Sequence, residues 1–161
     1  MTDITDNSLI KNFKPRKDSF YHQGSVRAND CKKLFESCKK DVIIYRSGLE
    51  LKFIRWCESA SSVVRWASEP ICIEYVSRQD GRVHKYFPDF IIETKDKNNI
   101  STTYIVEIKP YEQTVKPKPS ASVWSKRQWV KNQDKWKYAF EFAKKRKNTK
   151  FIIVTERFFG G

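Results

Sequence analysis

A glutamate and a lysine in the second half of the chain have the spacing of side chains that act together on one ligand. Glu107 and Lys109 flank Ile108 in a segment rich in β-branched residues. Alternate side chains of a β-strand point to the same face, so this spacing predicts that Glu107 and Lys109 share a face while Ile108 enters the core. A carboxylate and an ammonium placed in this way can act on one water molecule bound to a metal ion.

A second carboxylate, that of Asp89, lies just before the preceding strand segment. Residues 90–93 and 102–106 are separated by a polar turn, and pairing them predicts that Asp89 lies beside Glu107. Two adjacent carboxylates form a set of hard oxygen ligands that suits Mg²⁺, with Mn²⁺ as a substitute. Such an ion polarises a phosphoryl oxygen and lowers the pKa of a bound water, and a nearby ammonium orients that water or offsets charge in the transition state.

Each of these residues also has an ordinary structural explanation. Lysine and glutamate often protect the edge of a sheet, so Glu107 and Lys109 alone could be a solvated pair. Asp89 could be a turn residue that follows Pro88. However, Asp89 has apolar neighbours in the sequence, where an acid is costly unless it is paired or binds a metal ion. The order of Asp89 and Glu107 along the chain therefore favours the metal site.

A third acidic residue, Glu50, belongs to a helix expected further upstream. Ser47 is a good N-cap, and apolar residues recur after it at helical spacing. Glu50 follows this cap by three residues, as in a capping box. Glu50 could therefore complete the metal site or only cap the helix, and we expect that one carboxylate does not fill both roles at once.

The elements that position these residues change type along the chain. Helical spacing predicts helices over residues 28–40, from Ser47 onward, and from about Ser122 to Lys147. Strands are expected at residues 71–76, 83–87, 90–92, 102–108 and 151–155, with an Asp80-Gly81 hairpin turn between the first two and a short apolar link at residues 42–45. This order predicts an α/β or α+β fold with one mixed sheet.

Domain organisation follows from the length of 161 residues, which fits one compact domain with tails. Residues 1–27 are polar and irregular and are interpreted as an N-terminal basic arm or tail, followed by a single domain over residues 28–161. The last expected helix carries an apolar stripe that would place its tryptophans in the core. The members of the stripe are Trp129, Gln133, Trp136, Phe140 and Ala143.

The charge balance favours a polyanionic partner. Lys and Arg number 32 against 19 Asp and Glu, a net charge of +13, so nucleic acid is expected, with an anionic membrane or an acidic protein as alternatives. No apolar segment is long enough to span a bilayer and the N-terminus lacks a secretory signal, so we expect a cytosolic protein. The four cysteines lack zinc spacing and are expected to be reduced and mostly buried.

The motifs around the acidic residues resemble a known nuclease superfamily. Pro88-Asp89 followed by Glu107-Ile108-Lys109 resembles the PD-(D/E)xK signature, and Glu50 matches an acidic residue that many members add upstream. A longer series resembles the head completion nuclease of T-even-like tailed phages, itself similar to the endonuclease subunit of Tn7-type transposons. Its members, over roughly residues 42–157, are Tyr45–Glu50, Trp66–Pro70, His84–Phe90, Val106–Pro110, Asn132, Lys135–Trp136 and Thr155–Glu156.

This resemblance implies a fold and a set of site residues. The fold would be a single restriction-endonuclease-like α/β domain with a central mixed sheet flanked by helices. Asp89 and Glu107, with Glu50, would bind Mg²⁺, and Lys109 would be the catalytic lysine. The helix after the lysine often adds polar residues to the site in this family, and Asn132 and Lys135 are the candidates here. No small-molecule cofactor is expected.

The implied activity is metal-dependent hydrolysis of phosphodiester bonds in double-stranded DNA. The implied setting is phage head completion before tail joining, in the host cytoplasm or associated with the virion, with head vertex or portal-neck proteins as partners. Candidate DNA contacts are Trp124, Lys126, Arg127 and Lys131.

Other functions remain open at this stage. The chain could be a transposon strand-cleaving subunit, although the end at Gly161 leaves little room for a partner-binding extension. It could be a mismatch or repair nuclease. It could also be a catalytically idle virion plug that only binds DNA, but a retired site has no physical reason to keep Asp89 and Glu107 together.

Overall fold

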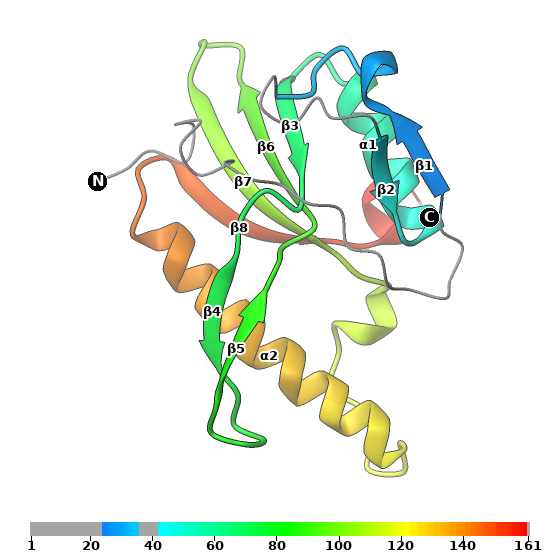
Figure 1. The fold of residues 1–161 in the computed structure, drawn as a ribbon, viewed down its shortest axis with the longest axis vertical. Coiled ribbons are helices and arrows are strands. Elements are labelled where there is room, and N and C mark those ends of the chain that lie inside the picture. Colours follow the sequence, from blue (N-terminus) through cyan, green and yellow to red (C-terminus); the bar gives the residue numbers. More distant parts are fainter. Residues whose placement is uncertain (1–23, 36–41, 161) are drawn as a thin grey trace.

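The computed structural model describes residues 24–35 and 42–160, whose arrangement Figure 1 shows. The strands are β1 (Gly24–Arg27), β2 (Val42–Tyr45), β3 (Val63–Ser68), β4 (Ile73–Val76), β5 (Val83–Tyr86), β6 (Phe90–Lys95), β7 (Ser101–Ile108) and β8 (Thr149–Val154). The α-helices are α1 (Gly48–Ser59) and α2 (Val123–Lys144), and the short 3-10 helices are η2 (Ala28–Asp30), η4 (Tyr111–Gln113) and η5 (Glu156–Phe159).

A central sheet of β3, β6, β7 and β8, in that order, forms the middle of the molecule. β6 is antiparallel to both β3 and β7, whereas β7 and β8 are parallel, so the sheet is mixed, as predicted. The predicted pairing of residues 90–93 with 102–106 is confirmed, because Phe90 lies opposite Val106 and Glu93 opposite Thr103. A parallel pair needs a long crossover, and the segment containing α2 provides it between β7 and β8.

The two faces of the central sheet bury separate apolar clusters. Phe90 and Val106 point to one face and pack with α1 residues that include Phe53. Ile91 and Ile105 point to the other face and pack with Trp136 of α2, among others. Because side chains alternate along a strand, the sheet separates α1 from α2 and the fold is the mixed α/β architecture expected from the sequence (Figure 1).

Two pairs of short strands lie outside the central sheet. β4 and β5 form an antiparallel hairpin whose turn contains the predicted Asp80-Gly81 pair, with Gly81 in the left-handed region at a φ of 67°. β1 and β2 form the other pair. The last four residues of the expected N-terminal arm, 24–27, therefore form a strand, and residues 1–23 lie outside the described residues.

The helix predicted over residues 28–40 is wrong where the structure describes it. Only η2 is helical there, and the residues that follow make a parallel bridge between Leu34 and Trp66. The backbone N–H groups of Lys32 and Lys33 donate to the Glu58 carboxylate at 2.8 and 3.1 Å. These tertiary hydrogen bonds satisfy the donors that a helix would have used. Residues 36–40 lie outside the described residues.

Besides β1, two strands were not predicted. Residues 42–45, interpreted as a link, form β2, and β3 had no prediction at all. β3 has buried residues on both of its faces, including the adjacent Trp66 and Ala67, so it lacks the alternation by which a half-buried strand is found in a sequence.

The predicted helix after residue 122 is present, but its buried face is partly different. Ser122 caps α2 as expected, and Trp136, Ala139 and Ala143 are buried. Phe140, predicted to lie in the apolar stripe, is 54% exposed. The small alanines allow the helix backbone to approach the sheet, and Phe140 lies about 100° further around the helix than Ala139.

The cysteines of the described residues are free thiols. Cys31 and Cys57 are buried, as expected, whereas Cys72 is exposed. Cys38 lies outside the described residues. Neither α1 nor α2 combines the length and the apolar character needed to cross a lipid bilayer.

Candidate active site

Asp89 and Glu107 meet at one end of the β6–β7 pair. The antiparallel register of these strands continues outward to the two acidic residues. Asp89 Oδ2 accepts a hydrogen bond of 2.7 Å from the backbone N–H of Ile108, and Lys109 Nζ lies 3.4 Å from Glu107 Oε1. Ile108 is buried in the cluster against α1, on the opposite face. The structure thus brings Asp89, Glu107 and Lys109 together as their spacing predicted.

Tyr86 lies in the site, although it was not predicted as a site residue. Its hydroxyl donates a buried hydrogen bond of 2.6 Å to Glu107 Oε2. Burial and the neighbouring Glu107 carboxylate strongly raise the pKa of Tyr86, so the phenol remains a donor. Tyr86 is the last residue of β5, which belongs to the separate hairpin. No local pattern pairs this hairpin with the end of β7, so the contact had no signal in the sequence beyond the proximity of Tyr86 to Asp89.

Glu50 lies in the first turn of α1, which Ser47 caps, and also lines the site. Ser47 Oγ accepts the N–H of Glu50 at 3.1 Å, and Glu50 Oε2 accepts the N–H of Arg46 at 2.9 Å. The same side chain lines the cavity that contains Asp89 and Glu107. The N-terminus of α1 faces the cavity, so Glu50 lies on its wall, and a role for Glu50 in binding the metal ion stays a prediction.

A fourth carboxylate, that of Glu69, reaches the same cavity and was not predicted as a site residue. Its oxygen Oε1 pairs with Arg46 Nη1 at 2.5 Å, and its N–H donates to the carbonyl of Asp89 at 2.8 Å. Glu69 has a φ of 46°, a left-handed conformation that costs a residue with a side chain on the order of 1 kcal/mol or more. Surrounding contacts hold this strained residue where the chain leaves β3.

Burial and the repulsion between neighbouring carboxylates change the pKa values of the site residues. Burial, followed by the charges of Glu107 and Glu50, raises the pKa of Asp89 well above its ordinary value. Burial also raises the pKa of Glu50. Burial disfavours the charged form of Lys109, but the nearby carboxylates outweigh this effect and raise its pKa. Lys109 is therefore an ammonium ion at neutral pH, and the carboxylates are poised to accept a cation.

The cavity around these groups has a volume of about 290 Å³. Its walls come from the N-terminus of α1, the β4–β5 hairpin, the ends of β6 and β7, and α2. The lining residues are Arg46, Glu50, Glu69, Tyr75, His84, Lys85, Tyr86, Phe87, Asp89, Glu107, Lys109, Lys131 and Lys135. Most of these side chains are polar, as expected for a site that handles a charged substrate.

The two accessory candidates on α2 differ in position. Lys135 lines the cavity, with its Nζ 5.3 Å from the centre of the Tyr86 ring. Asn132 is buried in α2 and does not line the cavity. Lys131, predicted as a DNA contact, also lines the cavity.

The other three candidate DNA contacts lie outside the cavity at the N-terminal end of α2. Trp124 is 69% exposed. Lys126 donates to the carbonyl of Pro119 at 2.5 Å, and Arg127 is exposed.

The donor chemistry of the site fits a magnesium ion. Mg²⁺ is usually held by one or two carboxylates, with water and substrate phosphate completing its shell. Asp89 and Glu107 offer such a pair, and the carbonyl of Ile108 is a further candidate ligand. Within residues 24–35 and 42–160, no three acidic, histidine or cysteine side chains converge enough to hold an ion alone. The arrangement therefore suits a shared metal–substrate site rather than a closed structural one.

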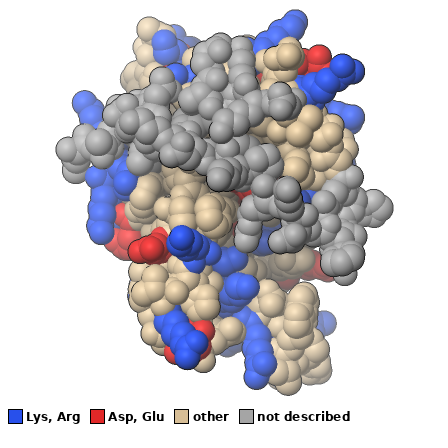
Figure 2. Space-filling view, viewed as in Figure 1, with Lys and Arg blue, Asp and Glu red and all other residues tan. Residues whose placement is uncertain are grey.

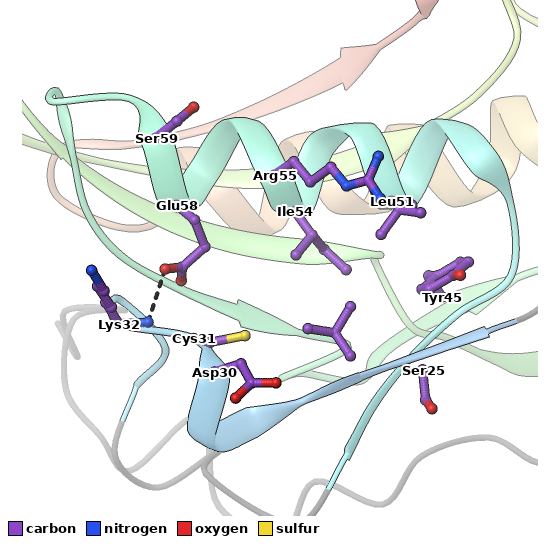
Figure 3. A pocket seen from close by; sticks show the side chains of 11 residues that line it. Ser25, Asp30, Cys31, Lys32, Tyr45, Leu51, Ile54, Arg55, Glu58 and Ser59 are labelled. Carbon is purple, nitrogen blue, oxygen red and sulfur yellow. Dashed lines mark hydrogen bonds between the residues drawn. The ribbon is translucent and has the colours of Figure 1, made fainter.

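A second, larger cavity lies between α1 and the N-terminal β1–η2 segment (Figure 3). Its volume is about 550 Å³, and Glu58 is the acidic residue through which α1 holds the facing segment. Both oxygens of Glu58 are engaged, because Oε1 also accepts the indole N–H of Trp66 at 2.7 Å. Glu58 joins three parts of the chain, and its contacts have the character of structural hydrogen bonds.

Comparison with known proteins identifies the family. No curated protein matches the chain. A family model described as the TnsA-like endonuclease N-terminal domain matches residues 60–156, more than half of the chain. The matched range contains Asp89, Glu107 and Lys109, and the mixed sheet with helices on both faces is compatible with a restriction-endonuclease-like fold. The chain therefore belongs to the TnsA-like endonuclease N-terminal family, within the PD-(D/E)xK superfamily.

Proposed function

We propose that this endonuclease-family protein hydrolyses DNA phosphodiester bonds in a Mg²⁺-dependent reaction at the cavity formed by Asp89, Glu107 and Lys109. The observation that carries the proposal is the placement of Asp89 and Glu107 side by side, with the pKa of Asp89 raised by burial and by the second carboxylate. Such repulsion is relieved when a cation binds. Mn²⁺ is expected to substitute, since it prefers the same oxygen ligands.

Each residue of the site has a distinct role in this mechanism. Asp89 and Glu107 hold the ion, and Glu50 completes its surroundings or helps to hold a second ion. The ion, when bound, supplies charge neutralisation at the phosphate and a lower pKa for the attacking water. Lys109 remains protonated, so it orients the water and stabilises negative charge rather than acting as the general base.

Tyr86 is a positioning residue in this mechanism. Its hydrogen bond to Glu107 Oε2 fixes the orientation of the carboxylate, and Oε1 is then directed toward Lys109. A group that does not touch the substrate can still contribute to catalysis by holding a metal-binding side chain in its reactive orientation.

For the biological role, we propose action on packaged DNA during phage head completion, before tail joining. The support is the ordered series of motifs that resembles the head completion nuclease, from Tyr45 to Glu156. This role would place the protein in the host cytoplasm during assembly or on the virion, beside head vertex or portal-neck proteins. A transposon strand-cleaving role is the second candidate, because the family model itself is named for the TnsA-like endonuclease.

The activity is tested by incubating the purified chain with supercoiled plasmid and Mg²⁺. We expect nicking or linearisation by the unmodified protein and none by Asp89→Ala or Lys109→Ala. Cleavage retained by both variants would show that the site lies elsewhere. DNA binding without any cleavage, by any of the proteins, would favour the idle plug.

The biological role needs a separate assay. DNA-filled heads that lack this protein are expected to join tails when the chain is added, but not when Asp89→Ala is added. Cleavage only in the presence of a transposase, at the ends of a mobile element, would favour the transposon role instead.

A further inference from the structure

Three basic residues of α2 form a row that leads into the active-site cavity. Arg127, Lys131 and Lys135 are spaced four residues apart, so they lie on one side of the helix. Lys131 and Lys135 line the cavity with Asp89, and Arg127 is exposed one turn further toward the helix N-terminus. The row therefore runs from solvent to the carboxylates.

The spacing of this row suits a phosphate backbone. A separation of four residues corresponds to a rise of about 6 Å along an α-helix. This distance is similar to that between successive phosphates of one DNA strand, so three cations in the row can face consecutive phosphates. A nucleic-acid strand repeats this spacing along its whole length, which favours nucleic acid as the partner of this surface.

The β4–β5 hairpin is fastened beside the exposed end of the row. Asp134 of α2 is buried and accepts both the backbone N–H of Arg78 at 2.9 Å and its Nε at 2.5 Å. Gln79 Nε2 donates to the carbonyl of Arg127 at 2.8 Å. These three hydrogen bonds hold the hairpin tip against α2, although the hairpin pairs with no strand of the central sheet.

The hairpin adds its own positive charge to the same side. Arg82 and Lys85 are exposed, and Lys85 also lines the active-site cavity. Figure 2 shows Lys and Arg side chains over the lower part of the molecule, where Figure 1 places the hairpin and the N-terminal half of α2. The two elements thus form the sides of one basic surface that ends at the carboxylates.

We propose that Arg127, Lys131 and Lys135 track the phosphates of the DNA strand that is cleaved, with the fastened β4–β5 hairpin as the facing wall. This proposal rests on the proposed DNA-cleaving function and names the surface that guides the substrate to Asp89 and Glu107. It predicts that the row, and not the overall positive charge, determines how the chain binds a duplex.

The test measures binding separately from cleavage. A fluorescein-labelled DNA duplex is titrated with the full chain in EDTA, and anisotropy is recorded over a series of salt concentrations. The double variant Arg127→Ala/Lys131→Ala is compared with Lys147→Ala/Lys150→Ala, which removes the same charge from two exposed residues beyond the C-terminal end of α2. Thermal melting checks that both variants fold.

We expect the row variant to bind roughly tenfold more weakly at low salt, with the slope of log K against log salt reduced by about two. The control variant should stay close to the unmodified chain. Restoring charge with Arg127→Lys/Lys131→Arg should restore most of the affinity. Equal losses in the row and control variants would overturn the proposal, because binding would then depend only on total charge. An unchanged affinity of the row variant would also overturn it.

The outcomes separate this proposal from the proposed function. Binding that depends on the row, without Mg²⁺-dependent cleavage, would reject the nuclease function and leave the surface assigned. Cleavage that requires Asp89, with no effect of the row variant on binding, would reject the surface and leave the function intact.

Discussion

Glu58 and the Asp89–Glu107 pair show two opposite ways of keeping carboxylates inside one small domain. Glu58 borders the larger cavity, in Figure 3, and accepts hydrogen bonds from the backbone N–H groups of Lys32 and Lys33 and from the indole of Trp66. Asp89 and Glu107 lie beside each other in the smaller cavity, where their charges repel. The donors around Glu58 stabilise the fold, whereas the repulsion between Asp89 and Glu107 remains despite their own donors and would be relieved by the proposed cation.

This difference separates a structural from a functional acid by physical criteria. A buried carboxylate with enough donors contributes to stability, and removing it leaves those donors unsatisfied. A carboxylate placed next to another one costs stability, and a protein has no structural reason to retain it. Cavity volume does not separate the two, since the larger cavity is the one beside Glu58.

The largest expected effect is on cleavage. Asp89→Ala removes one of the two proposed metal ligands and should reduce the initial rate of plasmid nicking by about a thousandfold, as the loss of a preorganised electrostatic group does. Glu58→Gln is the control, because its amide oxygen can still accept hydrogen bonds and it is remote from the site. If Glu58→Gln lost as much activity as Asp89→Ala, the distinction between the two groups would fail.

The next largest effect is on stability, and here we expect the loss of Glu58 to matter more than the loss of Asp89. Glu58→Ala leaves three N–H donors without their acceptor and should lower the free energy of unfolding by about 3 kcal/mol, measured by urea denaturation. Asp89→Ala should not show a comparable loss. A Glu58→Ala protein as stable as the unmodified chain would show that these hydrogen bonds are dispensable.

The pH dependence of stability sharpens the comparison. The pKa of Asp89 is raised in the folded state, so its contribution to stability is present below the pKa of an unfolded aspartate and is lost as pH rises through the raised value. Asp89→Asn should therefore become the more stable protein as pH rises, with a gap that grows by up to about 1.4 kcal/mol per pH unit. Urea denaturation in EDTA from pH 4 to pH 8 measures this gap, and a constant gap would contradict the assignment.

Addition of Mg²⁺ should reverse the result at neutral pH. Binding to the folded state stabilises it, so the unmodified chain should melt at a higher temperature with Mg²⁺ while Asp89→Asn changes little. Equal responses of the two proteins to Mg²⁺ would argue against Asp89 as a ligand.

The smallest expected effect comes from Tyr86. Tyr86→Phe removes the hydroxyl that donates to Glu107 and should slow cleavage by about tenfold, equivalent to one hydrogen bond of about 1.4 kcal/mol. Without this donor the Glu107 carboxylate is less firmly oriented, so the variant should need a higher Mg²⁺ concentration for half-maximal activity. Tyr104→Phe, on β7, is the control, because Tyr104 packs against the cluster on the α1 face. An unchanged Mg²⁺ requirement in Tyr86→Phe would leave Tyr86 with only a structural role.

Several features could be predicted because their causes are local. Ser47 caps α1, the Asp80-Gly81 turn closes the hairpin, and the β6–β7 register places Asp89 next to Glu107. Each depends on residues that are close in sequence or on a short antiparallel connection. The spacing of acids and lysine on such a frame was therefore enough to locate the candidate site.

Other features depend on contacts between distant segments. The segment after η2 is held by Glu58 rather than by helical hydrogen bonds, and Glu69 reaches the site only because β3 pairs with β6. Tyr86 meets Glu107 because the β4–β5 hairpin folds over the end of β7. Periodicity does not reveal these partners. Each contact joins segments that are distant in the sequence, and the pattern of apolar residues does not say how such segments pack against one another.

The sequence by itself determined which residues could do the chemistry and which strands would bring Asp89 and Glu107 together. The tertiary structure alone decided what surrounds them: the donor from Tyr86, the orientation of Glu50 toward the cavity, and the row of cations on α2. The physical reason is that side-chain alternation and turn geometry act over a few residues, whereas desolvation and charge interactions depend on every element packed around the site.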